Sequence, residues 1–310
     1  MTQSSYFKYD NHQSAWDKVL SNAEDARLAQ TWFQTETLDS WRHDRMRQPL
    51  RSIISSDVNA SWLTVGDGRF GTDAHWIINA GAQHVHASDI SETLLKIGSE
   101  KGFIADYSAQ NAESLSFEDR SFDYIYCKEA LHHFPRPYMA LYEMFRVAKK
   151  GVILTEPRDQ VPDRGPLAAM IYGFKSIFLR KREIAHTFEP VGNYVHSISE
   201  RELDKFLLGM HYTYVAYAGC NDEYVEGVEF LERDPVSNEG KKIKSKILKK
   251  IRRMNLYNFL GITKTGVLTA ALFKDVPDAS LLEQMKKAGW EVRRLPLNPY
   301  LDKNDAVVSL

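Results

Sequence analysis

The sequence predicts a doubly wound α/β protein with a mostly parallel sheet of seven strands, a helical cap before it and a lid insertion. Two observations support this fold class. Short apolar, partly β-branched runs alternate with segments of helical length between residues 61 and 157, as expected for parallel strands joined by right-handed crossovers. A glycine-rich turn follows the first run, at the sheet edge where such folds bind ligands. The 310 residues are enough to bury a substantial core.

The composition is ordinary for a globular enzyme, with 43% hydrophobic and 26% charged residues. A formal net charge of -1 argues against a protein devoted to wrapping nucleic acid. With Cys127 and Cys220 as the only cysteines, neither a disulfide framework nor a structural zinc site is expected. No histidine, cysteine and carboxylate cluster has metal-ligand spacing, so we expect no metal. Because no secretion signal or membrane-length apolar run is visible, we expect a cytoplasmic protein.

Residues 1–60 carry apolar side chains at helical intervals and are expected to form the helical cap. The stretch Trp41–Arg47 places aromatic and basic groups just before the first strand. Arg42 or Arg45 could pair with a ligand carboxylate through a forked hydrogen bond. The alternative is an exposed helix face on which the arginine stems cover apolar surface.

Residues 61–157 are expected to form a nucleotide-binding core of the Rossmann-like type. Gly66, Gly68 and Gly71 follow the first strand in G-x-G-x-x-G spacing, and a helical segment comes next. Glycine suits this turn because a Cβ would block a positive φ or the close approach of a nucleotide. Asp89 ends the second strand about 20 residues further on, where it can accept hydrogen bonds from a ribose diol. A chance glycine turn and an aspartate that caps the next helix are the alternatives.

Polar side chains follow the carboxyl ends of several predicted strands. In open α/β sheets, ligands bind outside this edge. The residues expected there are Asp67, Asp89, Asn111, Lys128, Glu129 and Glu156. The ligand and the reacting groups are therefore expected among these side chains.

The pattern changes after Pro157. Residues 158–200 contain prolines, an aromatic and basic stretch and two histidines, and are expected to form a lid over the ligand edge. Residues 201–275 are expected to hold the last two core strands together with a basic helix. Residues 276–310 form a C-terminal extension with one helix and a short extended run.

The basic helix is predicted from Lys241 to Met254, with lysine or arginine at eight positions and an aliphatic stripe. This pattern is typical of a helix that lies on a membrane surface or faces RNA. We favour instead a solvated helix whose stripe packs on the sheet. Accordingly, we expect a small-molecule substrate and no stable nucleic-acid partner, and peripheral membrane contact is an alternative that we do not favour. The sequence does not determine the oligomeric state.

The glycine spacing of this chain also fits the nicotinamide-dependent enzymes, but two features argue against that class. The step Asn111-Ala112-Glu113 follows the third strand region, and the strand Ser121–Cys127 runs into the segment Glu129–Phe134. At these residues the chain resembles the class I S-adenosylmethionine-dependent methyltransferases, particularly the small-molecule branch that includes the ubiquinone and menaquinone biosynthesis enzymes. The resemblance covers residues 61–157 well and the two late strands loosely.

The resemblance implies S-adenosylmethionine as the cofactor. In such enzymes the glycine turn holds the methionine half, the aspartate after the second strand holds the ribose, and the residues after the third strand hold the adenine edge. The implied cofactor residues are Gly66, Asp67, Gly68, Gly71, Asp89, Ile90, Asn111, Ala112, Cys127 and Lys128. Thr64 and Phe70 depart from the family pattern, which commonly has an acid and a third glycine at these positions.

Methyl transfer from a sulfonium requires alignment of the acceptor and, where the acceptor carries a proton, a general base. We expect transfer to an oxygen or nitrogen of a small molecule. The candidate bases by position are His132, Glu129 and His133, and we prefer the first two because His133 is expected to face the core. His186 and His196 in the lid are further candidates, and paired histidines that only shape a turn are the alternative. An NAD(P)-dependent oxidoreductase and a non-catalytic adenosine-cofactor-binding protein are the alternative functions.

Overall fold

The computed structural model describes residues 9–160, 163, 170, 188–189 and 191–300. Its centre is a sheet of eight strands in the order β3-β2-β1-β4-β5-β7-β6-β8. The strands are β1 (Ser61–Val65), β2 (His84–Asp89), β3 (Asp106–Ala109), β4 (Phe122–Lys128), β5 (Ala148–Pro157), β6 (Tyr214–Cys220), β7 (Val267–Phe273) and β8 (Glu291–Arg294). The first five strands are parallel, and β7 pairs antiparallel with both β5 and β6.

The sheet confirms the predicted α/β class, with one strand more than the seven expected. The additional strand is β8, which forms from the short extended run after the last helix and pairs antiparallel with β6. This pairing places Arg294 opposite Tyr214, and Val292 packs against the core. The edge of the sheet therefore lies one strand further out than expected.

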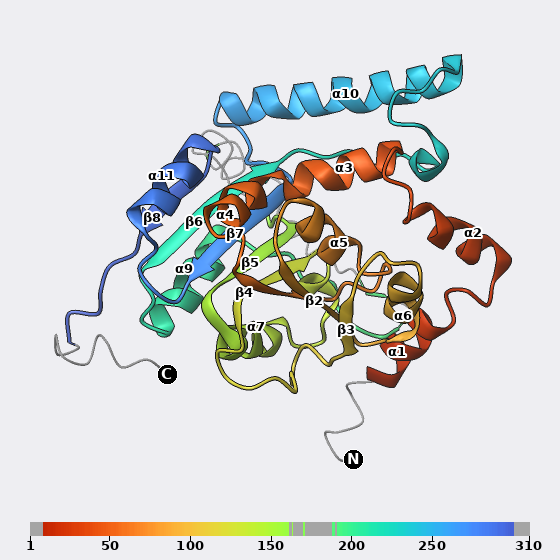
Figure 1. Ribbon diagram of the computed structural model, residues 1–310. Coiled ribbons are helices and arrows are strands. Elements are labelled where there is room, and N and C mark those ends of the chain that lie inside the picture. The colour runs from red at the N-terminus through yellow and green to blue at the C-terminus, as the bar shows by residue number, and fades with distance from the viewer. Residues whose placement is uncertain (1–8, 161–162, 164–169, 171–187, 190, 301–310) are drawn as a thin grey trace.

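Helices surround the sheet and form the segment before it (Figure 1). The α-helices are α1 (Tyr9–Asp17), α2 (Ala23–Thr31), α3 (Leu38–Arg47), α4 (Arg51–Ser56), α5 (Thr72–Asn79), α6 (Thr93–Glu100), α7 (Pro137–Val147), α9 (Glu200–Gly209), α10 (Asn238–Phe259) and α11 (Ala279–Lys287). Short 3-10 helices are η2 (Gln48–Leu50), η3 (Leu131–His133) and η4 (Val228–Phe230). A reciprocal capping box opens α9, in which the Ser199 hydroxyl accepts from the Glu202 N–H and the Glu202 carboxylate accepts from the Ser199 N–H.

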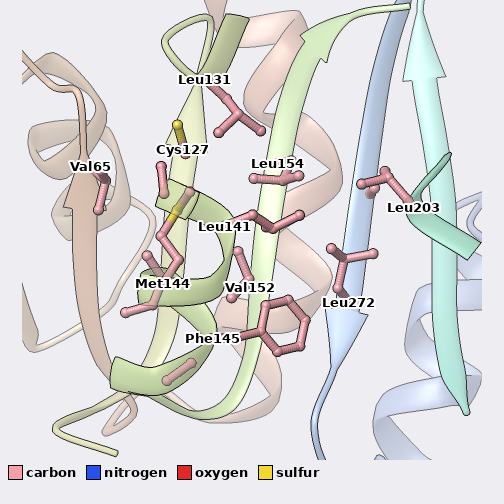
Figure 2. Close-up of a cluster of buried hydrophobic side chains, with 14 of the residues drawn as sticks. Val65, Cys127, Leu131, Leu141, Met144, Phe145, Val152, Leu154, Leu203 and Leu272 are labelled. Atoms are coloured by element: carbon pink, nitrogen blue, oxygen red, sulfur yellow. The ribbon is translucent and has the colours of Figure 1, made fainter. Parts of the chain in front are cut away.

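Strand β4 shows why both faces of the sheet are covered. Its side chains alternate, with Ile125 and Cys127 in the cluster that contains α7 and α9, and Tyr124 and Tyr126 in the cluster that contains α4, α5 and α11. Figure 2 shows the first cluster, where α7 directs its apolar side chains at β4 and β5. Because both faces of this part of the sheet are covered, the central residues of β4 are apolar or aromatic on either side.

Phe70 anchors the N-terminal segment on the glycine turn. Its φ is +60°, in the left-handed region, and its ring is fully buried and stacks on Phe33 with the ring centroids 4.2 Å apart. The left-handed backbone costs about 1 to 2 kcal/mol for a residue with a Cβ. Burial of the ring contributes roughly 1.5 to 3 kcal/mol, which offsets that cost. Phenylalanine at this family glycine position thus ties the helical cap to the core.

Helix α10 is longer than the predicted helix and packs in a different place. Its buried residues Ile247 and Ile251 contact Leu38 of α3 and Val228 of η4, so the expectation that the stripe packs on the sheet is wrong. Figure 1 shows α10 along the outside of the molecule, next to α3. The tertiary structure provides an apolar surface on α3 that the sequence pattern did not reveal.

Most of the expected lid, including the aromatic and basic stretch 171–182 and His186, lies outside the described residues. The divisions of the chain at 60, 157, 200 and 275 remain predictions.

Among the described residues, no helix combines the length and the apolar character needed to cross a bilayer.

Candidate active site

A cavity of about 380 Å³ opens at the carboxyl edge of the sheet. It lies between the glycine turn after β1, the ends of β2, β3 and β4, and helix α1. Most of the site residues predicted from the sequence line it. These are Gly66, Asp67, Gly68, Asp89, Ile90, Asn111, Ala112, Lys128, Glu129 and His133. The fold therefore brings residues from four segments of the core to one place.

Gly71, Cys127 and His132 were predicted at the site but do not line this cavity. Gly71 precedes α5 with a φ of +75°, and a Cβ there would lie 2.7 Å from the Ile104 side chain. The Cys127 thiol is fully buried in the core, 3.9 Å from a carboxylate oxygen of Glu156. Gly71 and Cys127 shape the turn and the strand end from behind the cavity, and their predicted contact with the cofactor stays a prediction.

The Asp67 carboxylate is turned toward the protein and caps helix α5. It accepts hydrogen bonds from the backbone N–H groups of Asp73 (3.0 Å) and Ala74 (2.8 Å) and from the Thr64 hydroxyl (2.9 Å). Burial, reinforced by the nearby Asp73 carboxylate, raises the pKa of Asp67 to about 7. Asp67 therefore holds the turn in shape.

Asp89 presents a buried carboxylate beside the glycine turn. It is 5% exposed, accepts a hydrogen bond from the Ser91 N–H at 3.0 Å, and burial raises its pKa to about 6 in spite of backbone N–H donors. A Cβ on Gly68 would lie 2.9 Å from the nearer Asp89 carboxylate oxygen. Glycine at this position therefore lets the turn pack directly against the carboxylate, where a side chain would collide with it. A carboxylate at the end of the second strand is the acceptor that a ribose diol needs.

The N-terminal helix forms part of the cavity wall, which the sequence reasoning missed. Tyr9, His12 and Trp16 of α1 line the cavity. The Tyr9 hydroxyl donates to the Glu113 carboxylate at 2.6 Å, and the Arg136 guanidinium donates to the same carboxylate and to the Tyr9 oxygen. This linkage holds α1 over the segment that follows β3. The only signal in the sequence was the aromatic and polar character of the first helix.

His43 also lines the cavity and was not singled out from the sequence. Its Nδ1 lies 3.3 Å from the Lys128 ammonium, which is itself 3.6 Å from the Asp73 carboxylate. Burial lowers the pKa of His43 well below its usual value, and the Lys128 charge lowers it further. His43 is therefore neutral and accepts from Lys128. This contact joins α3 of the cap to the end of β4.

Arg42 and Arg45, considered as partners for a ligand carboxylate, bind the protein instead. The Arg42 guanidinium pairs with Asp222 and, at 2.8 Å, with Asp39. Arg45 donates to the backbone carbonyl of Asn221 at 2.8 Å. Both arginines thus fasten α3 to the loop after β6.

Glu129 and His133 face the cavity from the turn after β4. Glu129 adopts a left-handed backbone with a φ of +48°, and its N–H donates to the Thr155 carbonyl at 2.8 Å. The Nδ1 of His133 lies 2.6 Å from the Glu189 carboxylate, and burial together with the adjacent imidazole of His132 lowers the pKa of His133. His133 therefore lines the cavity and does not face the core, which corrects the prediction.

His132 is the buried member of the histidine pair, at 8% exposure. Its Nδ1 is 2.5 Å from Glu156, whose second oxygen accepts from the N–H groups of Ala130 and Leu131. Burial acts to lower the pKa of His132, but the hydrogen bond and charge of Glu156 outweigh it and the pKa is raised. The backbone N–H of His196, from the expected lid, donates to the His132 carbonyl at 3.0 Å. Glu156 thus fixes the turn that carries all three candidate bases.

A family profile described as "Methyltransferase domain" matches residues 63–155. The ubiquinone/menaquinone biosynthesis C-methyltransferase UbiE of Bartonella quintana is 31% identical over 119 residues, covering 35% of this chain and 45% of that protein. The demethylmenaquinone methyltransferase of Listeria monocytogenes serotype 4a is 41% identical over 132 residues, covering 35% of this chain and 54% of that protein. The chain thus spans about half the length of these curated relatives.

Among solved structures, the magnesium protoporphyrin IX methyltransferase of Synechocystis PCC 6803 with bound S-adenosylhomocysteine is similar, with a TM-score of 0.43 and 14% identity over 70% of this chain and 92% of that chain. The family match and the relatives show that residues 63–155 are similar to a methyltransferase domain. The predicted resemblance to the class I S-adenosylmethionine-dependent methyltransferases, in their ubiquinone and menaquinone biosynthesis branch, is confirmed over these residues.

Proposed function

We propose that this protein transfers a methyl group from S-adenosylmethionine to a small-molecule acceptor. The observation that carries the proposal is the buried Asp89 carboxylate, which lines a cavity beside the glycine turn in the segment that matches the methyltransferase profile. Asp89 would accept hydrogen bonds from the ribose, while Ile90, Asn111 and Ala112 would hold the adenine. When bound, S-adenosylmethionine supplies a methyl group already activated on a sulfonium.

The chain's own contribution is to position the acceptor and to take up a proton. Positioning can lower the barrier by about 7 to 11 kcal/mol, and a general base adds roughly 100-fold to 10,000-fold. An acceptor atom that carries a proton must release it as the bond to the methyl carbon forms. The cavity offers Glu129 and His133 for this step.

His133 suits the role of proton acceptor because its lowered pKa keeps the imidazole neutral near pH 7, and the Glu189 carboxylate holds its Nδ1. The other ring nitrogen then remains free to accept the proton from the acceptor. Glu129 is the second candidate, because a strained left-handed residue at a ligand cavity is typical of functional sites. His132 would act through its neighbours, as a positioning residue.

The acceptor atom is proposed to be oxygen or nitrogen. Two of the relatives are named as ubiquinone/menaquinone C-methyltransferase and demethylmenaquinone methyltransferase, so an acidic carbon is a further candidate. An O–H, N–H or acidic C–H group at the acceptor carries a proton that the same base would remove. The fold alone does not choose among acceptors.

Calorimetry with S-adenosylhomocysteine tests the cofactor assignment. The wild type should bind it, and Asp89→Ala should weaken binding by about 10-fold to 100-fold, because hydrogen bonds to a charged group contribute about 1.5 to 3 kcal/mol. Asp106→Ala is the matched control, since Asp106 lies exposed at the start of β3, outside the cavity. Binding of NAD or NADP in place of S-adenosylhomocysteine would contradict the proposal.

Turnover is tested with S-adenosylmethionine that carries an isotopically labelled methyl group. Cell extracts fractionated by size are incubated with the protein, and mass spectrometry follows the label. We expect small molecules that gain one labelled methyl group. Cofactor binding without transfer to any fraction would instead favour the non-catalytic alternative.

A further inference from the structure

The outward face of helix α10 is strongly basic. Eight lysines and arginines lie on this helix against the single acid Glu239, in a chain whose formal net charge is -1. Lys244 pairs with Asp234, and Lys250 lies 3.6 Å from Glu223. Six other basic side chains are exposed and have no carboxylate partner among the residues that the structure describes. They are Lys241, Lys242, Lys246, Lys249, Arg252 and Arg253.

The same outward face becomes apolar at the end of the helix. At 100° per residue, Leu256 and Leu260 fall on the same side as Lys242, Lys249 and Arg253, opposite the buried Ile247 and Ile251. Leu256 and Leu260 are each 53% exposed. Phe259 is 87% exposed and Tyr257 is 41% exposed. The helix therefore presents a row of cations that leads into a cluster of large, exposed apolar side chains.

Helix α10 emerges from the edge of the sheet where the cavity opens. It is inserted between β6 and β7, and Cys220 at the end of β6 pairs with Val267 at the start of β7. The Asn221 side chain, just after β6, donates to Asn255 of α10 at 2.8 Å. A surface that docks through α10 would therefore lie near the carboxyl edge of the sheet.

We propose that α10 is an interfacial helix that docks this protein on an anionic lipid bilayer. Cations on the helix would approach lipid phosphates, and the leucines with Phe259 and Tyr257 would enter the boundary between headgroups and acyl chains. Exposed leucine and phenylalanine make no favourable contact with a phosphate backbone, so this surface suits a bilayer better than RNA. The inference goes beyond the proposed methyl transfer and does not depend on it.

Vesicle co-sedimentation of the full chain tests the proposal. We expect binding to vesicles of equal parts phosphatidylcholine and phosphatidylglycerol, weakened by salt, and little binding to pure phosphatidylcholine. The triple variant Lys242→Glu, Lys249→Glu, Arg253→Glu should lower the partition coefficient by at least roughly 100-fold, because each basic residue near an anionic surface contributes about 1 kcal/mol. Absence of wild-type binding to the anionic vesicles would overturn the proposal.

A matched control reverses three exposed cations on other helices, Lys96 of α6 with Arg201 and Lys205 of α9. This variant has the same net charge as the α10 triple variant and should keep wild-type binding. An equal loss in both triples would show nonspecific attraction and overturn the assignment to α10. Circular dichroism and the melting temperature confirm that each variant is folded.

The apolar end of the helix is tested separately with Leu256→Ser, Phe259→Ser and Leu260→Ser. We expect roughly tenfold weaker binding to anionic vesicles and reduced insertion, because apolar burial is lost while the charge is unchanged. If the wild type does not bind the vesicles but binds duplex RNA tightly, and this variant binds the RNA equally well, RNA is the partner instead. A change in oligomeric state on this substitution, again without vesicle binding, would identify a second copy of the chain.

Discussion

Replacement of Glu156 by glutamine tests how the turn after β4 is held. Glu156 is 1% exposed and accepts from the N–H groups of Ala130 and Leu131 with one oxygen and from His132 with the other. Glutamine can keep its oxygen toward the two N–H groups, and its amide then faces His132. The bond to a protonated His132 is lost, which should cost about 2 to 3 kcal/mol in the free energy of unfolding.

The loss should depend on pH in a defined direction. Glu156 raises the pKa of His132 in the folded state. The contact therefore stabilises the folded protein to its full extent below the unfolded histidine pKa of about 6.5. This stabilisation is lost as the pH rises through the pKa of His132 in the folded protein. Above that range the imidazole is neutral and can accept from the glutamine amide. The difference between wild type and Glu156→Gln should therefore be largest at low pH and shrink at high pH.

Urea unfolding followed by circular dichroism measures this difference, at about pH 6 and at about pH 8.5. Glu118→Gln, at an exposed glutamate, should change the free energy of unfolding by less than about 0.5 kcal/mol at both pH values. An equal loss for Glu156→Gln at both pH values would refute the reasoning about His132. No loss at all would refute the role of Glu156 in holding the turn.

Three further predictions follow from other contacts. Gly98→Ala should destabilise the protein by about 1 to 3 kcal/mol, because the new Cβ would lie 2.3 Å from the Phe70 carbonyl oxygen; an unchanged melting temperature would contradict this packing. Lys128→Met should raise the pKa of His43 toward its usual value, since the Lys128 charge adds to burial in lowering it; NMR titration of the imidazole measures the change, and a constant pKa would contradict the assigned contact. His133→Asn should lower kcat/KM by roughly 100-fold to 10,000-fold and remove the acidic limb of the pH profile if His133 is the base, whereas an unchanged profile would leave Glu129.

Much of the core was predictable from local patterns. The glycine turn, the aspartate that ends β2 and the polar residues after β4 are all set by short-range signals, because strand ends and tight turns impose their own residue types. The same signals placed Gly66, Gly68 and Asp89 at the cavity.

The orientation of side chains within each turn was less predictable. His132 and His133 are adjacent, and a 3-10 turn can direct either one inward. The choice depends on Glu156, which comes from the next strand of the sheet and binds His132. The orientation of Asp67 was hidden for a similar reason. The sequence places Asp67 in the glycine turn, and only the structure shows that its carboxylate caps α5.

The sequence by itself determined the fold class, the glycine turn and the family resemblance, since these depend on residue periodicity and on backbone constraints within short segments. Only the tertiary structure decided which residues from distant segments complete the site and where the basic helix packs. His43 and helix α1 reach the cavity, and α10 rests on α3, because the cap folds back over the core. Such contacts join residues far apart in the chain and depend on complementary shape and charge, which no local pattern encodes.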